Sequence, residues 1–438
     1  MNYPIVGDLV KFFGRKRKTG TEDLRRLADA LLSERGEASG VAIARELLAT
    51  YAEAGADAKL GFLHTLAVRF GADTARIGQA VARYQAEPTP QAAMELHNAA
   101  EPRRQELIRR LNLAPGGTRS LVQMREDLIH NLAGNPGFEL VDKDFVHLFS
   151  AWFNRGFLVL KRIDWTTPAH ILEKIIHYEA VHEITSWDDL RRRLEPSDRR
   201  CFAFFHPTLT DEPLIFVEVA LTHGVPAAIA PLLAEEREPI GPELETTAVF
   251  YSISNCQIGL RGVSFGNFLI KQVVEQLNRE LPSLGKFVTL SPVPGFAAWL
   301  AAERSAEKPG FLTAEDKTAL EAIDAFGWHR DAAALKLLKP LLHQAVAQYF
   351  LLTKAASGKP VDPVARFHLD NGARLDRINW LGDVSPRGMA SGLGFMVNYV
   401  YDPAQIEDNH EAFAHSGTLV VSHAVKKLLR GKSEREPR

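Results

Sequence analysis

The chain has 438 residues, 46% of them hydrophobic and 24% charged, which suits a globular protein of two or three domains at about 150 residues each. A formal net charge of −2 excludes a globally basic surface for nucleic acid, and two cysteines are too few for a disulfide framework or a cysteine-rich zinc site. No apolar run in the sequence approaches the length of about 18 residues that a membrane-spanning helix needs.

Residues 1–155 carry the spacing of α-helices interrupted by glycine and proline. Leu24, Leu27 and Leu31 fall on one helical face before a stop at Gly36, and Pro90 stands where a first helical turn tolerates proline. This part of the sequence contains no pattern that indicates catalysis. We therefore expect an all-α helical bundle that serves packing or self-association.

From residue 156 onward, short apolar runs alternate with helical patterns, which predicts a mixed α/β or α+β domain around one sheet. The predicted strands are 201–206, 214–222, 247–254, 286–291 and 394–401. Cys201 and Cys256 stand in or beside two of these runs, so we expect buried free thiols. Unpaired thiols indicate the reducing cytoplasm.

A glycine-rich turn follows the third predicted strand. Gly259, Gly262 and Gly266 leave the backbone bare before a helix that would begin near residues 266–267, and Arg261 adds a positive charge. Free N–H groups at a helix start can bind a phosphate, but the spacing fits neither the P-loop nor the dinucleotide pattern. It partly fits the turn that binds the pyrophosphate of coenzyme A in the acetyltransferase fold. A turn without any ligand is the alternative.

Ser291 and His368 are the candidates for acid–base chemistry. Ser291 ends the fourth predicted strand, and the prolines at 292 and 294 fix the chain that follows, which gives the hydroxyl a defined position. His368 carries an imidazole, which exchanges protons near neutral pH. A serine that only forms a turn and a histidine that is only structural are the alternatives. Neither residue stands in a GxSxG context, which disfavours an α/β-hydrolase.

Other polar residues accompany this pair in segment 366–388 and in the last predicted strand. Asn371 and Asn379 could donate hydrogen bonds to an oxyanion, and Asp383 could support the surrounding loops. Tyr399 and Tyr401 share one strand face, where a tyrosine is either part of the core or a substrate contact.

Four long stretches resemble malonyl-CoA decarboxylases, in matching order between residues 204 and 399. They are FFHPTLTDEPLIFVEVALT, FYSISNCQIGLRGVSFGNFLIKQVVEQL, TLSPVPGF and VARFHLDNGARLDRINWLGDVSPRGMASGLGFMVNY. The resemblance implies a helical domain over residues 1–155 and a catalytic domain of acetyltransferase-like (GNAT-like) fold over residues 156–438. It also implies conversion of malonyl-CoA to acetyl-CoA and carbon dioxide by a homodimer or homotetramer.

Carried over residue by residue, the resemblance makes Ser291 the catalytic proton acceptor and His368 the proton donor. It assigns a substrate contact to Tyr401. The implied coenzyme A loop comprises Arg261, Gly262, Val263, Ser264, Phe265, Gly266 and Asn267. Some relatives carry glutamate at the position of Ser264, so we expect no loop carboxylate in this chain.

The reaction that the resemblance implies needs no added cofactor or metal, because the thioester carbonyl can hold the electron pair left by carbon dioxide as an enolate. An acyl-CoA N-acetyltransferase with the same coenzyme A loop is the alternative enzyme, and it would acylate an added amine. A helical scaffold that only senses acyl-CoA is a third possibility, and it would bind without turnover.

Overall fold

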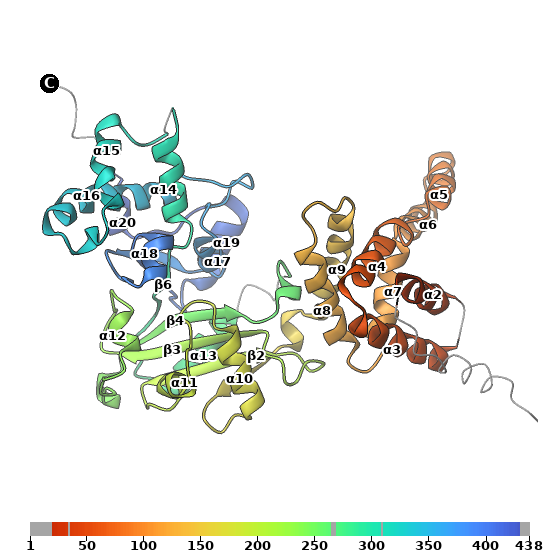
Figure 1. Cartoon of the computed structure of the whole chain (residues 1–438), viewed down its shortest axis with the longest axis horizontal. Coiled ribbons are helices and arrows are strands. Elements are labelled where there is room, and N and C mark those ends of the chain that lie inside the picture. Colours follow the sequence, from red (N-terminus) through yellow and green to blue (C-terminus); the bar gives the residue numbers. More distant parts are fainter. Residues whose placement is uncertain (1–19, 34–35, 264–268, 308–309, 430–438) are drawn as a thin grey trace, which may run out of the picture. The chain divides into compact units, whose positions relative to one another are not determined.

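The computed structural model describes residues 20–33, 36–263, 269–307 and 310–429 (Figure 1). The chain divides into two compact units. The helical unit comprises Met1–Phe157 with the short segments Pro207–Leu209 and Gln257–Ser264, and the sheet unit comprises Leu158–His206, Thr210–Cys256 and Phe265–Arg438. None of the described helices is long and apolar enough to cross a membrane.

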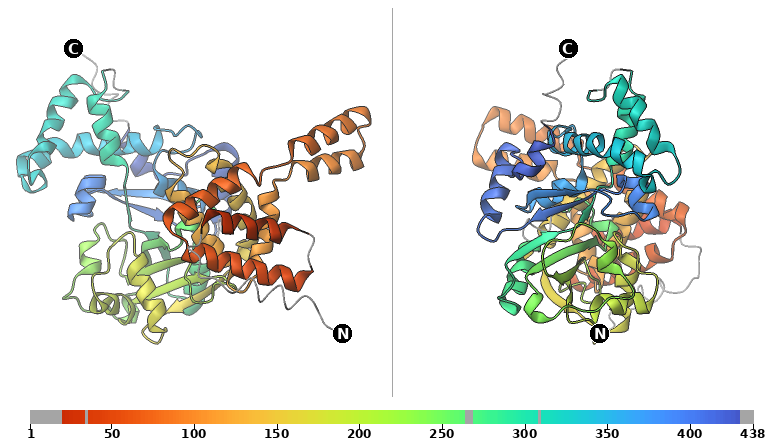
Figure 2. Two further views of the ribbon diagram at one scale, coloured as in Figure 1. Left: turned by 45° about the vertical axis from the view of Figure 1, so that its right-hand side comes forward. Right: turned by 90° about the vertical axis from the view of Figure 1, so that its left-hand side faces the viewer.

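The helical unit is built from the helices α2 (Thr21–Leu32), α3 (Glu37–Glu53), α4 (Ala56–Val68), α5 (Thr74–Ala86), α6 (Pro90–Ala100), α7 (Arg103–Asn112), α8 (Gly117–His130) and α9 (Phe138–Trp152). Of these, α2, α3, α4, α7, α8 and α9 pack on one another and α5 packs on α6. Leu24, Leu27 and Leu31 are buried, as their spacing predicts. Thr89 caps α6 by accepting a hydrogen bond from the backbone N–H of Ala92. Helices α5 and α6 form a hairpin that extends from the other helices of this unit (Figure 2).

The sheet unit contains a mixed sheet with helices between and after its strands. The strands are β1 (Val159–Ile163), β2 (Arg199–Phe205), β3 (Ile215–Thr222), β4 (Thr247–Asn255), β5 (Lys286–Thr289), β6 (Ser291–Pro292), β7 (Arg374–Asn379) and β8 (Met396–Val400). The helices are α10 (Ala169–Tyr178), α11 (Trp187–Leu194), α12 (Ala230–Leu233), α13 (Leu269–Glu280), α14 (Phe296–Ser305), α15 (Ala314–Ala319), α16 (Ala332–Leu351), α17 (Pro363–Asp370), α18 (Pro386–Gly392), α19 (Ile406–Ser416) and α20 (His423–Lys427).

The strand order is β1-β2-β3-β4-β5-β8-β6, with β7 paired to β8, and among these described strand pairs β4 and β5 are parallel while the others are antiparallel. The fold class predicted from the sequence, helices followed by a mixed α/β domain, is confirmed. All five predicted strands are present, whereas β1 and β7 were not predicted. The predicted helix start at residues 266–267 lies outside the described residues, and α13 is described from Leu269.

Alternate residues of β2 face opposite sides of the sheet, and both sides are apolar. Cys201, Ala203 and Phe205 pack with residues of α10 and α11, while Phe202 and Phe204 pack with residues of α13. A strand that is buried on both faces reads as a continuous apolar run, which is why this strand was easy to predict. The two cysteines are free and buried, as expected.

Strands β4 and β5 diverge where the sheet unit forms its pocket. They pair from Thr247 to Phe250 and from Lys286 to Thr289, after which the chain leaves β4 and Ser291 pairs with Val397 of β8. On its other edge, β4 contains an extra residue, Tyr251, where the register with β3 shifts. Such a bulge bends a strand and increases its twist. The end of β4 and the start of β6 are therefore separated by a space.

Candidate active site

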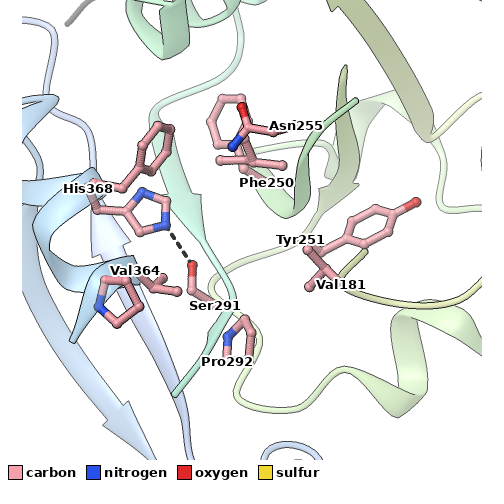
Figure 3. Close-up of a pocket in the computed structure, with 11 residues that line it drawn as sticks. Val181, Phe250, Tyr251, Asn255, Ser291, Pro292, Val364 and His368 are labelled. Carbon is pink, nitrogen blue, oxygen red and sulfur yellow. Dashed lines mark hydrogen bonds between the residues drawn. The ribbon is translucent and has the colours of Figure 1, made fainter. Parts of the chain in front are cut away.

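A cavity of about 230 Å³ occupies the space between β4, β6 and α17 (Figure 3). Its walls are Val181, Phe250, Tyr251, Ile253, Asn255, Ser291, Pro292, Pro363, Val364, Phe367 and His368. Figure 3 shows the Tyr251 hydroxyl directed away from Ser291, which leaves Asn255, Ser291 and His368 as the polar groups of the pocket. None of these described wall residues is a lysine, arginine, aspartate or glutamate. The pocket is thus apolar with a few uncharged polar groups.

Ser291 and His368 face each other in this pocket although 77 residues separate them in sequence. Ser291 begins β6, His368 lies in the last turn of α17, and a distance of 3.0 Å joins Ser291 Oγ to His368 Nε2. The two residues are 7% and 3% exposed. The two residues predicted to carry the chemistry therefore form one hydrogen-bonded pair at the pocket wall.

Helix α17 places His368 through a buried cap. Asp362 precedes the helix, and its Oδ1 accepts a hydrogen bond of 2.7 Å from the backbone N–H of Ala365, with Pro363 in the first turn. Its Oδ2 accepts a second bond, of 3.1 Å, from the Tyr349 hydroxyl of α16. Burial raises the pKa of Asp362 to about 6. This cap fixes the start of the helix and hence the position of His368.

Two tyrosines of the β8 segment hold the His368 ring. The Tyr401 hydroxyl lies 2.8 Å from His368 Nδ1, and the Tyr399 ring stacks on the imidazole at a centroid distance of 4.5 Å. Burial lowers the pKa of His368 to about 3, so the imidazole is neutral at pH 7. Burial also raises the pKa of the Tyr401 hydroxyl, which therefore stays protonated. The structure thus gives Tyr401 a contact with the histidine, and the substrate contact that the resemblance implies for it stays a prediction.

The acid sensitivity of folding is expected to depend on His368. Its pKa is about 3 in the folded chain and 6.5 in the unfolded chain, so the unfolded chain binds more protons between these values and stability falls as pH falls through this window. Between pH 7 and pH 5, the wild type should lose about 2 kcal/mol more unfolding free energy than His368→Gln. Urea denaturation at both pH values measures this, and an identical loss in both proteins would contradict it.

Three further polar residues that sequence reasoning missed surround the pair. Asn255 lines the pocket from the end of β4. Thr289 Oγ1 lies 2.9 Å from Ser291 Oγ, and the Asn398 side-chain amide donates to the Thr289 carbonyl oxygen at 2.8 Å. The spacing of Thr289 and Ser291 was a usable signal, since residues two apart in a strand share a face. The positions of Asn255 and Asn398 depend on strand pairing that the sequence does not reveal.

The remaining predicted polar residues do not line the pocket. Asn371 donates to the backbone carbonyl oxygen of Phe367, and Asp383 accepts from the backbone N–H of Ser385. Asn379 donates to the Asn398 side-chain oxygen at 2.8 Å, and Asn398 in turn donates to the backbone of Thr289 at the end of β5. None of the three is placed to hold a substrate oxyanion in this pocket, and the described residue whose amide side chain lines it is Asn255.

The predicted coenzyme A loop is described only in part. Gly262 has a φ of 78°, a backbone conformation that favours glycine, and Val263 is buried. Ser264, Phe265, Gly266 and Asn267 lie outside the described residues. The role of this loop in coenzyme A binding stays a prediction.

Gly259 is a glycine because of packing within the helical unit. Arg125 of α8 is 2% exposed, and its Nη1 donates to the Gly259 carbonyl oxygen at 2.8 Å while its Nε donates to Asp142 at 2.8 Å. A Cβ at Gly259 would lie 1.9 Å from the backbone oxygen of Val122. The first of the loop glycines therefore admits the backbone of α8, a cause that differs from the phosphate contact considered from the sequence.

Gly259→Ala is expected to lower the free energy of unfolding by about 3 kcal/mol, because the added methyl group overlaps helix backbone that cannot move aside cheaply. Gly262→Ala is the matched control, since nothing lies within 4 Å of its Cβ position and only the positive φ opposes it, at a cost of about 1 kcal/mol. Urea denaturation of both variants measures the difference. Equal losses would show that backbone conformation, and not contact with α8, decides these positions.

The fold and the site together define an enzyme of mixed α/β architecture with a buried serine–histidine pair in an uncharged pocket. Comparison with known proteins identifies its relatives. The C-terminal domain of malonyl-CoA decarboxylase matches residues 156–438, and the N-terminal domain of the same family matches residues 70–153. The chain therefore belongs to the malonyl-CoA decarboxylase family.

Individual relatives agree with this assignment. The mitochondrial malonyl-CoA decarboxylase of Anser anser anser is 36% identical over 395 residues, which cover 83% of this chain and 78% of that protein. The crystal structure of malonyl-CoA decarboxylase from Rhodopseudomonas palustris is 60% identical, covers 93% of this chain and 99% of that chain, and has a TM-score of 0.91. The corresponding structure from Agrobacterium vitis is 56% identical over the same shares, with a TM-score of 0.88.

Proposed function

We propose that this chain is a carboxy-lyase that converts malonyl-CoA to acetyl-CoA and carbon dioxide in the pocket of Ser291 and His368. The observation that carries the proposal is the 3.0 Å contact between Ser291 Oγ and His368 Nε2, set in walls without a charged side chain among the described residues. The family supplies the substrate, since the relatives are named malonyl-CoA decarboxylases.

The reaction breaks the bond between the α-carbon and the carboxylate of the malonyl group. The electron pair of that bond moves to the α-carbon and is delocalised onto the thioester oxygen as an enolate, while carbon dioxide departs. The α-carbon then takes one proton, which gives the methyl group of acetyl-CoA. The thioester itself holds the electrons, so the proposed reaction uses no added cofactor or metal.

The pocket suits each stage of this reaction. Walls without charged groups stabilise neutral carbon dioxide relative to the carboxylate that precedes it. The Asn255 amide lines the pocket and can donate a hydrogen bond to the thioester oxygen as charge develops there, while the Ser291 hydroxyl oxygen accepts from His368 Nε2–H. His368 supplies the proton from the Nε2–H group of its neutral ring, because the α-carbon of the enolate is a stronger base than the deprotonated ring, and the ring regains a proton from solvent water after the product leaves.

The proposal extends to the parts of the chain outside this pocket. Residues 261–267 would bind coenzyme A, as the resemblance implies, and residues 1–155 would mediate a homodimer or homotetramer beside a catalytic domain at 156–438. A cytoplasmic location agrees with two buried free cysteines. The molar mass in solution, measured by light scattering against the chain mass of 48.6 kDa, tests the assembly.

Purified protein incubated with malonyl-CoA and a chelator tests the function. We expect equal amounts of carbon dioxide and acetyl-CoA, at a rate that the chelator leaves unchanged. An N-acetyltransferase would instead release free coenzyme A only when acetyl-CoA and an amine are supplied together, and a sensor would bind malonyl-CoA without turnover. Either of these outcomes would replace the proposed function.

A further inference from the structure

Thr289 is the last member of a row of four hydrogen-bonded side chains that begins at Tyr401. Tyr401 contacts His368 Nδ1 at 2.8 Å, His368 Nε2 contacts Ser291 Oγ at 3.0 Å, and Ser291 Oγ contacts Thr289 Oγ1 at 2.9 Å. Thr289 is 0% exposed and ends β5. The row therefore passes from one side of the imidazole to the other and stops inside the protein.

The Thr289 side chain and backbone are both held in place. The backbone N–H of Tyr399 donates to Thr289 Oγ1 at 3.2 Å, and the Asn398 side-chain amide donates to the Thr289 carbonyl oxygen at 2.8 Å. The Asn398 amide can point only one way, because its Oδ1 accepts from Arg377 Nε, a group that always donates. The hydroxyl of Thr289 is thus presented to Ser291 at a fixed position.

The number of protons available fixes which group donates in each hydrogen bond of this row. The Ser291 hydroxyl has one proton and two neighbours, His368 Nε2 and Thr289 Oγ1. A histidine that donates its proton in the pocket must carry that proton on Nε2, and the Nε2–H group then donates to Ser291 Oγ. The Ser291 proton must consequently point elsewhere, and Thr289 Oγ1 is the protein acceptor at hydrogen-bond distance.

The contact between Tyr401 and His368 favours the same direction of hydrogen-bond donation. A phenol is a stronger hydrogen-bond donor than an imidazole N–H, and an imidazole nitrogen is a stronger acceptor than a phenol oxygen. The Tyr401 hydroxyl therefore donates to His368 Nδ1, and the proton of the neutral ring stays on Nε2. Both ends leave Ser291 donating to Thr289.

We propose that Thr289 is a positioning residue for the decarboxylation: by accepting the Ser291 hydroxyl proton, it keeps His368 Nε2 in the form that carries a proton. This inference rests on the proposed function, in which His368 is the proton donor. Without the Thr289 hydroxyl, His368 Nε2 is the side-chain acceptor that remains in contact with Ser291 Oγ among the described residues. If Ser291 donated its proton to His368 Nε2, the neutral ring would carry its own proton on Nδ1. This tautomer cannot donate a proton into the pocket.

The test compares Thr289→Val, which has a similar shape but no hydroxyl, with Thr289→Ser, which retains the hydroxyl. We expect Thr289→Val to lower kcat by about 10- to 100-fold with KM changed less than about 2-fold, because it disturbs proton donation and not binding. Thr289→Ser should keep kcat within about 3-fold of wild type. If the valine variant does not fold, Thr289→Ala replaces it with the same expected values.

The tautomer gives a readout that loss of packing alone would not change. The ¹⁵N shifts of His368, assigned by comparison with His368→Gln in selectively labelled protein, should report Nε2–H in wild type and Thr289→Ser and a larger share of Nδ1–H in Thr289→Val. Wild-type kcat in Thr289→Val, an unchanged tautomer, or equal loss in both variants would overturn the inference. Full activity in His368→Ala would instead overturn the assignment of His368 as proton donor, on which the inference rests.

Discussion

His368→Ala is expected to lower kcat for malonyl-CoA decarboxylation by about 10³-fold, the largest effect of any single substitution in the pocket. The variant removes the proposed proton donor and leaves its hydrogen-bond partners Ser291 and Tyr401 in place. KM should change little, because the proposed role of the imidazole is to protonate the reacting carbon and not to bind the coenzyme A part of the substrate. Acetyl-CoA formation measured over a range of malonyl-CoA concentrations gives both constants.

His343→Ala is the matched control for this substitution. His343 lies on α16, and its ring packs against Trp380 and Phe395 without lining the pocket. We expect its kcat within about 2-fold of wild type, with any cost confined to stability. If His368→Ala kept wild-type kcat, the assignment of the proton donor would be wrong.

Ser291→Ala is expected to lower kcat by about 10²-fold, because it removes a hydroxyl that bonds His368 and lines the pocket in which decarboxylation is proposed to occur. The same kinetic measurement applies. The kcat of the double variant Ser291→Ala/His368→Ala should lie within about 3-fold of the kcat of the slower single variant, since groups that act as one unit give non-additive losses. Fully multiplicative losses would show that the two residues act independently.

Ser252→Ala provides the control for removal of a buried serine. Ser252 lies on β4, is 1% exposed and donates to the Glu179 carboxylate, and it is not among the pocket walls. Loss of this bond should lower stability by about 1 kcal/mol while kcat stays near the wild-type value. A serine that only formed a turn at position 291 would behave in the same way, and Ser291→Ala would then keep its activity.

The sequence predicted the strands that are buried on both faces and missed those with polar residues. β2 and β3 read as continuous apolar runs because helices cover both sides of the sheet. β1, with the sequence VLKRI, is mostly exposed at the sheet edge, and β7, with the sequence RLDRIN, carries three charged side chains. Their pairing partners, and not their own composition, make these two segments strands.

The candidate catalytic residues could be named from the sequence, but their contacts could not. Ser291 and His368 meet only because β6 pairs with β8 and α17 packs beside them. The contact of Tyr401 with the imidazole follows from the same long-range pairing, and a single sequence carries no local signal for it. The apolar character of the pocket was equally invisible, because its walls come from distant segments such as Val181 and Asn255.

The glycines of the turn after β4 illustrate a second limit. A glycine can be required by a ligand, by a positive φ or by a neighbouring backbone, and the sequence is the same in each case. At Gly259 the neighbour is the α8 backbone, and at Gly262 the conformation itself favours glycine. Only tertiary structure separates these causes.

A crystal structure with a malonyl-CoA analogue that cannot lose carbon dioxide tests the central claim most directly. We predict that its three-carbon head lies in the cavity beside β6, with one of its oxygens about 3 Å from Ser291 Oγ or His368 Nε2. An analogue whose head is bound elsewhere in the protein, with neither side chain in contact, would contradict the assignment of this pocket as the site of decarboxylation.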